Sequence, residues 1–155
     1  MLKPDSLRKA LTDAVPVLRN NPDMLRLFID SGSLGATLAA SLSFEKRYTL
    51  NVVVTDFSGE IDLLLVPVLA WLREQQPDIM TTDEGRKKGF TWIADINNDS
   101  SMDISISLLL TERTRVSQVG DALYVDNIPE PAPPEPVTRP MALYMRDELV
   151  SKWDE

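Results

Sequence analysis

Phe44-Glu-Lys-Arg-Tyr-Thr-Leu-Asn-Val-Val-Val-Thr55 is the stretch that decides the fold class, because its side chains alternate between two faces. Every second residue from Tyr48 to Val54 is apolar, and the residues between them are mostly polar. A period of two is the signature of a strand with one buried face, since successive side chains of a strand point in opposite directions. We therefore expect a long strand over residues 44–55.

A helix is expected to follow this strand. Residues 56–59 (Asp-Phe-Ser-Gly) end the strand and supply residues that cap helices. Apolar side chains then recur at helical spacing at Ile61, Leu64, Leu65, Val68, Leu69 and Leu72. This spacing predicts an amphipathic helix over 60–75, bent at Pro67, which packs on the sheet through Ile61, Leu65, Val68 and Leu72.

The segments before residue 44 are expected to begin with a helix. Residues 4–20 carry an apolar stripe, and Pro16 should kink or end that helix because it removes a backbone donor. Residues 24–30 predict a strand and residues 31–33 (Ser-Gly-Ser) a turn. The alternation in 34–43 favours a strand, but its small residues also suit a helix, so both remain open.

Two hairpins are expected after the 60–75 helix. A polar loop over 81–89 leads to a strand over 90–96, a turn at 97–100 and a returning strand over 102–111. Residues 116–119 and 122–125 favour a second hairpin around Gly120-Asp121. The order of helix, strands, helix and strands indicates an α+β domain, in which two helices back a mixed or antiparallel sheet.

The composition changes sharply after residue 128. Six of the eleven prolines lie in residues 129–140, which predicts an extended linker that cannot pack as a core element. We expect a domain over 1–128 that folds without the rest, the linker over 129–140, and a C-terminal arm over 141–155 with a turn at Arg146-Asp147 and a possible β-hairpin.

The arm is the first candidate interface. Its apolar side chains favour burial against something, either the same subunit or a neighbouring subunit or partner, and the sequence leaves both open. The candidate contact residues of the arm are Leu143, Tyr144, Leu149, Val150 and Trp153. A second candidate is the basic cluster Arg86, Lys87 and Lys88, although charge runs are usually just solvated.

Composition excludes several chemistries. The chain has no Cys and no His, which removes disulfides, Ser-His-Asp and Cys-His catalysis and almost every zinc site. Its net charge of −8 disfavours non-specific nucleic-acid binding. Neither a secretory signal nor an apolar run long enough for a membrane is apparent, so we expect a protein made in a cytosol, with no cofactor and no metal.

Carboxylates near the 97–100 turn offer an alternative function. Asp95-Ile-Asn97-Asn-Asp99 copies the start of a calcium loop, but Ser100 replaces the glycine and Ile106 the bidentate glutamate. Asp95, Asp103 and Glu112 are candidate catalytic carboxylates, although nothing in the sequence marks a cleft around them. A soluble enzyme or ligand-binding domain that uses these carboxylates is the alternative to an assembly component.

Several segments, taken in order, carry a resemblance to a known family. They are residues 44–57, Gln76-Pro-Asp-Ile-Met80, Asn97-Asn-Asp-Ser100, the stretch that ends Pro136-Val-Thr-Arg-Pro140, and Glu148-Leu-Val-Ser-Lys-Trp153. With them the chain resembles the tail completion protein R family of Peduovirus-type temperate phages, which have contractile tails. The resemblance runs end to end and includes no catalytic signature.

This resemblance implies a structural virion protein that finishes the head-proximal end of the tail, so that the tail can join the head. The order of elements is also similar to that of tail terminators, small α+β subunits that form sixfold rings, which is an analogy of fold only. The implied partners are further copies of the chain in a ring, the tail tube and sheath proteins, and the neck proteins, with no base-specific nucleic-acid contact and no membrane.

Overall fold

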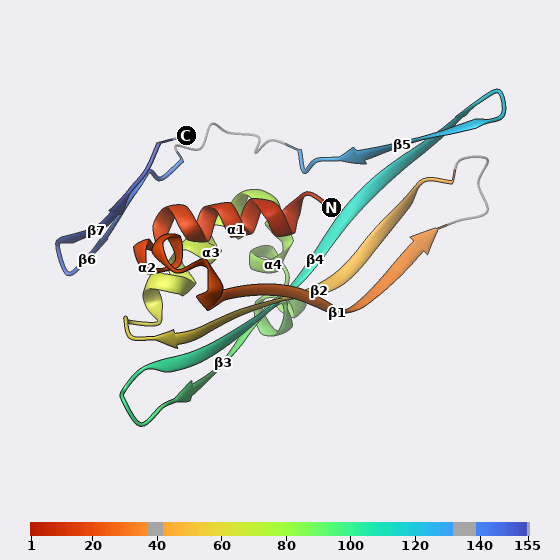
Figure 1. Ribbon diagram of the computed structural model, residues 1–155. Helices are drawn as coiled ribbons and strands as arrows, with labels where there is room; N and C mark the ends of the chain where they lie inside the picture. Colours follow the sequence, from red (N-terminus) through yellow and green to blue (C-terminus); the bar gives the residue numbers. More distant parts are fainter. Residues whose placement is uncertain (37–41, 132–138, 155) are drawn as a thin grey trace.

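The computed structural model describes residues 1–36, 42–131 and 139–154, which form helices packed on one face of an antiparallel sheet (Figure 1). The elements in chain order are α1 (Lys3–Ala14), α2 (Pro16–Asn20), the 3-10 turn η1 (Pro22–Met24), β1 (Leu25–Ala36), β2 (Phe44–Phe57), α3 (Asp62–Gln75), α4 (Asp78–Thr81), the π-helical turn η2 (Gly85–Gly89), β3 (Phe90–Ile96), β4 (Met102–Val119), β5 (Ala122–Ile128), β6 (Ala142–Met145) and β7 (Glu148–Lys152). The α+β class and the antiparallel sheet are confirmed.

The sheet is built around β4. Its strand order is β1-β2-β4-β3, and every neighbouring pair is antiparallel. β3 pairs with residues 102–108 of β4, and β5 pairs with residues 113–119 of the same strand. Because Arg113 pairs with both Glu45 of β2 and Ile128 of β5, β5 must lie on the side of β4 opposite β2. The two hairpins therefore share one long strand.

The alternation in residues 44–55 is confirmed as a strand, which continues to Phe57. Its even-numbered residues from Tyr48 to Val54 are buried, as are all even-numbered residues of β4 from Ile104 to Val116. These side chains form the face of the sheet on which the helices pack. β4 is longer than the strand predicted over 102–111, because the alternation of buried and outward side chains continues through Glu112 and Thr114. Both of these buried residues are polar, so the alternation is not visible as hydrophobicity in the sequence.

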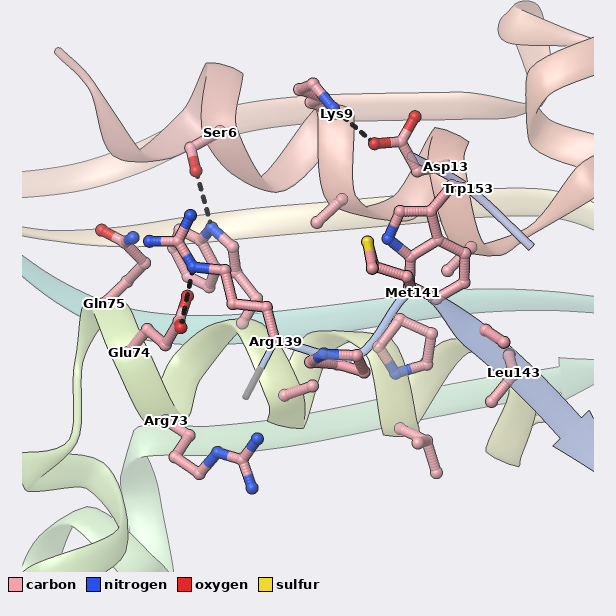
Figure 2. A pocket seen from close by; sticks show the side chains of 18 of the residues that line it. Ser6, Lys9, Asp13, Arg73, Glu74, Gln75, Arg139, Met141, Leu143 and Trp153 are labelled. Atoms are coloured by element: carbon pink, nitrogen blue, oxygen red, sulfur yellow. Dashed lines mark hydrogen bonds and ion pairs between the residues drawn. The ribbon is translucent and has the colours of Figure 1, made fainter. Parts of the chain in front are cut away.

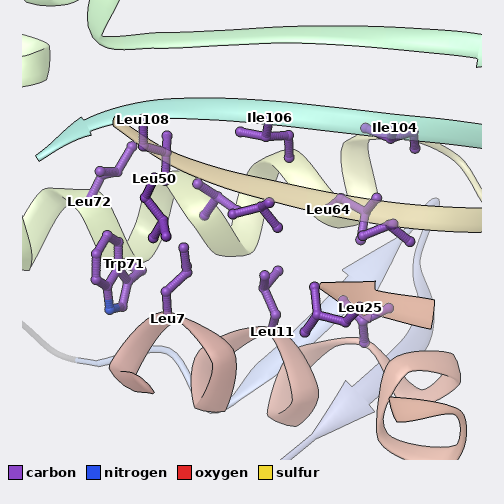
Figure 3. Packing of buried hydrophobic residues seen from close by; sticks show 14 of the residues in the cluster. Leu7, Leu11, Leu25, Leu50, Leu64, Trp71, Leu72, Ile104, Ile106 and Leu108 are labelled. Atoms are coloured by element: carbon purple, nitrogen blue, oxygen red, sulfur yellow. The ribbon is translucent and has the colours of Figure 1, made fainter. Parts of the chain in front are cut away.

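The core lies between this face and the helices α1 and α3 (Figure 3). Leu7 and Leu11 of α1 point toward α3 and the sheet, and neither is more than 1% exposed. Pro16 separates α1 from α2, as its missing donor predicts. No helix among the described residues is long and apolar enough to cross a membrane.

The predicted contact stripe of α3 is partly wrong. Val68 and Leu72 are buried as expected, but Leu65 and Ile61 are only half-buried and Leu69 is 48% exposed. The buried side of α3 is instead formed by Leu64, Pro67, Val68, Trp71 and Leu72. α3 is rotated about its axis relative to the prediction because α1 packs beside it. Trp71 of α3 contacts α1, and its indole Nε1 donates to Ser6 Oγ at 2.9 Å.

Two local predictions are also wrong. Residues 31–33 do not form a turn but continue β1 after an irregularity between Ile29 and Ser31, because β2 is long enough to pair with them. Residues 81–89 are not simply a loop, since α4 ends at Thr81 and η2 covers Gly85–Gly89. Of the ambiguous segment 34–43, Leu34–Ala36 belong to β1, and residues 37–41 lie outside the described residues.

Candidate interaction surfaces

A buried polar network ties the start of α1 to the sheet. Glu112 is 6% exposed, and its Oε1 accepts the backbone N–H of Leu2 at 2.7 Å while its Oε2 accepts the Tyr48 hydroxyl at 2.7 Å. Burial, together with the hydrogen bond to Glu112 and its charge, raises the pKa of Tyr48 far above its ordinary value. The tyrosine therefore stays a neutral donor.

Gln76 extends this network to the C-terminal part of the chain. Its Oε1 accepts from Lys3 Nζ at 2.6 Å and from the backbone N–H of Thr111 at 3.0 Å. Lys3 is 4% exposed and also donates to Glu130 Oε1 at 3.0 Å. Glu130, near the start of the Pro-rich segment, is thus bound at the place where α1, α3 and β4 meet.

The C-terminal arm forms a β-hairpin of β6 and β7 that lies beside α1 and α2 of its own chain (Figure 1). Its turn residues Arg146 and Asp147 both have positive φ, the geometry of a tight hairpin turn. Ser151 is buried, and its hydroxyl donates to the backbone oxygen of Asp13 at 2.8 Å while accepting from Arg19 Nη2 at 3.1 Å. Ion pairs of Arg139 with Glu74 and of Arg146 with Glu60 lie at the surface.

The five apolar arm residues predicted as contacts divide into two groups. Leu143, Val150 and Trp153 are half-buried, and Trp153 packs against the core of its own chain. Tyr144 and Leu149 are cross-strand partners and remain 62% and 54% exposed. The hairpin thus presents one apolar pair away from its own subunit.

A groove remains between the arm and the helices (Figure 2). Its volume is about 600 Å³, and it lies between α1, α3 and residues 139–143 and 153–154 of the arm. Ala10, Pro67, Ala70, Met141 and Trp153 give it a largely apolar lining. The arm therefore rests over the two helices without filling the space between them.

The ribbon formed by residues 113–128 of β4 and β5 is a surface that sequence reasoning missed. It projects past the helices (Figure 1), and every residue of β5 is exposed. Leu123, Tyr124 and Val125 are 54–65% exposed although they are consecutive and apolar. The uninterrupted apolar run in the sequence could have indicated this surface, because a strand with apolar side chains on both faces is usually covered on both faces.

The basic cluster lies in η2, just before β3. Arg86 donates to Asp83 and, at 3.1 Å, to the backbone oxygen of Met80, so this arginine is used locally. Lys87 and Lys88 are exposed, and no hydrogen bond or ion pair joins them to the described part of the chain. These two lysines are the part of the cluster that is free to meet a partner.

The candidate catalytic carboxylates are not brought together. Asp95 and Asp103 are cross-strand partners on the helix-free face, whereas Glu112 points to the opposite, buried face. Asp103 Oδ1 accepts the backbone N–H of Asp56 at 2.9 Å. Hydrogen bonds from Ser101 lower the pKa of Asp99 and hold that carboxylate within the turn. Within residues 1–36, 42–131 and 139–154 no group of acidic side chains is arranged to hold a metal.

Exposed apolar edge strands, such as β3 and β5, are places where another chain can add. The family model described as P2 phage tail completion protein R (GpR) matches residues 1–131. The chain is also 79% identical to Tail completion protein R of Escherichia phage P2, over 155 residues that cover all of both chains. The chain therefore belongs to the family of P2 phage tail completion protein R.

Membership in this family confirms the resemblance inferred from the sequence. The chain is a structural component of the virion tail with a role in tail completion, and the alternative of an enzyme is not supported. No solved structure matches the chain.

Proposed function

We propose that the chain closes the head-proximal end of a contractile tail as a ring, most simply a sixfold one, and so enables the tail to join the head. The observation that carries the proposal is the identity of 79% over the full length to a tail completion protein. A tail-terminator-like fold agrees with helices on one face of an antiparallel sheet, although this likeness is one of architecture only.

The exposed apolar surface supports a role in assembly. Large apolar side chains that stay in water usually mark contact sites when they gather in one place. Here they gather at the arm, where Tyr144 and Leu149 are exposed, and at the β4–β5 ribbon. A subunit with two such places can contact two neighbours.

Further contact residues, for a neighbouring subunit or for the tube, sheath and neck proteins, are proposed in the arm and in η2. Tyr144 and Leu149 are the outward pair, and Leu143, Val150 and Trp153 hold the hairpin in position beneath them. Lys87 and Lys88, with Arg86, offer positive charge to an acidic partner. The linker 129–140 and the arm 141–155 together act as a strap on the 1–128 domain.

The test is completion of tails in the absence of the chain. Phage in which its coding sequence carries an early stop codon should accumulate full heads and separate tails in electron micrographs. Adding the purified protein to such a lysate should restore joined particles and infectivity. Joined, infectious particles formed without the protein would refute the proposed function.

A further inference from the structure

The two ends of β4 carry exposed apolar side chains on edge strands. At one end, β3 exposes Trp92, Ile93 and Ile96 by 50%, 70% and 78%. At the other end, β5 exposes Leu123, Tyr124 and Val125. Ile93 pairs with Ser105 and Tyr124 with Ser117, twelve residues further along β4, so these two surfaces lie roughly 40 Å apart at ~3.3 Å per residue. The separation means that one subunit cannot bury one surface with the other.

Both β3 and β5 carry apolar side chains on both faces, which is typical of strands that are covered on both sides. The register places Ile93 on the helix-free face and its neighbours Trp92 and Ala94 on the helix side. In β5, Tyr124 lies on the helix-free face and Leu123 and Val125 on the helix side. Among the described residues, β3 and β5 each pair with β4 alone, so each leaves its other edge unpaired there. Exposed apolar edge strands are sites where another chain adds.

The charges of the two ends are complementary. Residues 54–62 and 89–112 contain no Lys or Arg, and the β3 end carries Asp56, Asp95, Asp99 and Asp103. The ribbon and the adjoining start of β2 carry Lys46, Arg47, Arg113 and Arg115 against Glu45, Asp121 and Asp126. The part of the β3 end near the 97–100 turn is therefore acidic, whereas Lys87 and Lys88 lie before Phe90 at the other end of β3, and the ribbon is weakly basic. The ribbon is thus attracted to the acidic part, and two such acidic parts repel.

We infer that the β4–β5 ribbon of one copy docks on the β3 end of the next copy, with Leu123–Val125 against Trp92–Ile96. This inference rests on the proposed ring and names its subunit contact. The two docking surfaces differ and lie at opposite ends, so the contact is head-to-tail, and such contacts close into a ring when the rotation between copies permits. A symmetric contact of two ribbons or two β3 ends would stop at a dimer.

Cross-linking in purified tails tests the contact, because the chain has no cysteine of its own. Ile93→Cys and Tyr124→Cys are combined in one chain, and tails containing it are treated with a short bis-maleimide. We expect a ladder of covalent multimers from the double variant and none from either single variant. A mixture of the two single variants should give covalent dimers and nothing larger.

A second cysteine pair, placed at polar positions, leaves the apolar side chains of the proposed contact unchanged. Thr91 is exposed on the same face as Ile93, and Ser117 is the exposed cross-strand partner of Tyr124. Thr91→Cys with Ser117→Cys should give the same ladder in tails. Dimers from Tyr124→Cys or Ser117→Cys alone would overturn the inference in favour of a symmetric contact. Tails that contain the double variants and join heads but yield no ladder would also overturn it, while leaving the proposed function intact.

Discussion

At the residue scale, the bond between Tyr48 and Glu112 gives the stability a specific pH dependence. The pKa of Tyr48 is raised above its ordinary value of 10.0 in the folded chain. Above pH 10 the unfolded chain releases the tyrosine proton and the folded chain keeps it, so the free energy of unfolding falls as pH rises. Tyr48→Phe removes this contribution. The difference between the two proteins in urea titrations should shrink above pH 10 by about 1.4 kcal/mol per pH unit.

The same substitution has an effect at neutral pH. Phe fills the space of Tyr48 but leaves Glu112 Oε2 without its donor at a buried site, which costs about 1–3 kcal/mol. Tyr124→Phe is the matched control, because the Tyr124 side chain is 54% exposed. Equal slopes for wild type and Tyr48→Phe between pH 10 and pH 11 would show that Tyr48 ionises freely.

A second residue-scale prediction separates two adjacent leucines of α3. Leu64 is fully buried and Leu65 only partly. Leu64→Ala should lower the free energy of unfolding by about 3–5 kcal/mol, because it leaves a cavity between α3 and the sheet. Leu65→Ala, with the same change of side chain, should cost no more than about half of that. Urea titration of the two variants measures the difference, and the reverse order would mean that α3 is turned the other way.

At the scale of elements, side-chain periodicity correctly predicted the features that depend on neighbouring residues in the sequence. The strand over 44–55, the helix after it and the break at Pro16 follow from side-chain spacing and backbone chemistry. The continuation of β1 through Ser31-Gly32-Ser33 does not, because it depends on pairing with a distant part of β2. The side of α3 that is buried likewise depends on packing against α1. Helical spacing within α3 alone cannot predict this packing.

The candidate surfaces were predictable to a similar degree. A proline-rich segment followed by apolar residues indicated the arm, and a hairpin with its turn at Arg146-Asp147 is what the structure has. Which arm residues face outward was not predictable, since this depends on where Ser151 binds Asp13. The ribbon was missed because residues 122–125 suggested only a small hairpin, and its exposure follows from the reach of β4 beyond the helices.

The arm should be dispensable for folding. Every buried apolar side chain in the described ranges precedes residue 117, so ending the chain after Ile128 leaves the core whole. The truncated chain should unfold cooperatively, with a free energy of unfolding lower by about 2–3 kcal/mol from the loss of Trp153 and the Ser151 bonds. Circular dichroism during urea titration measures this. A truncated chain without cooperative unfolding would make the arm part of the core.

The outward side of the arm should matter for assembly and little for stability. Tyr144→Ser should change the free energy of unfolding by less than about 0.5 kcal/mol, because the ring is 62% exposed. Completion of tails should nevertheless fall if Tyr144 contacts a neighbour. Leu143→Ser is the matched control, since that half-buried side chain lines the groove on its own helices and should lower stability. Full completion of tails by Tyr144→Ser at wild-type protein levels would remove Tyr144 from the proposed interface.

At the scale of the whole molecule, the net charge of −8 is unevenly distributed, and this asymmetry gives the subunit a direction. The acidic β3 end and the weakly basic ribbon are the two ends of one strand. Asp95 and Arg115 are both exposed on the helix-free face, and neither makes an ion pair within the described residues. Their charges are therefore available to orient one copy against the next.

Charge reversal at these two positions should show the direction of the contact. Asp95→Lys and Arg115→Glu each place like charges at the joint between copies, and each should reduce tail completion at least about tenfold, or ~1.4 kcal/mol. The double variant restores opposite charges with the polarity exchanged, so it should recover most of the activity. Asp5→Lys with Arg8→Glu on α1 is the control, because it makes the same charge changes at exposed positions away from both ends. Additive losses in the double variant, with unchanged urea unfolding, would show that the two ends do not meet.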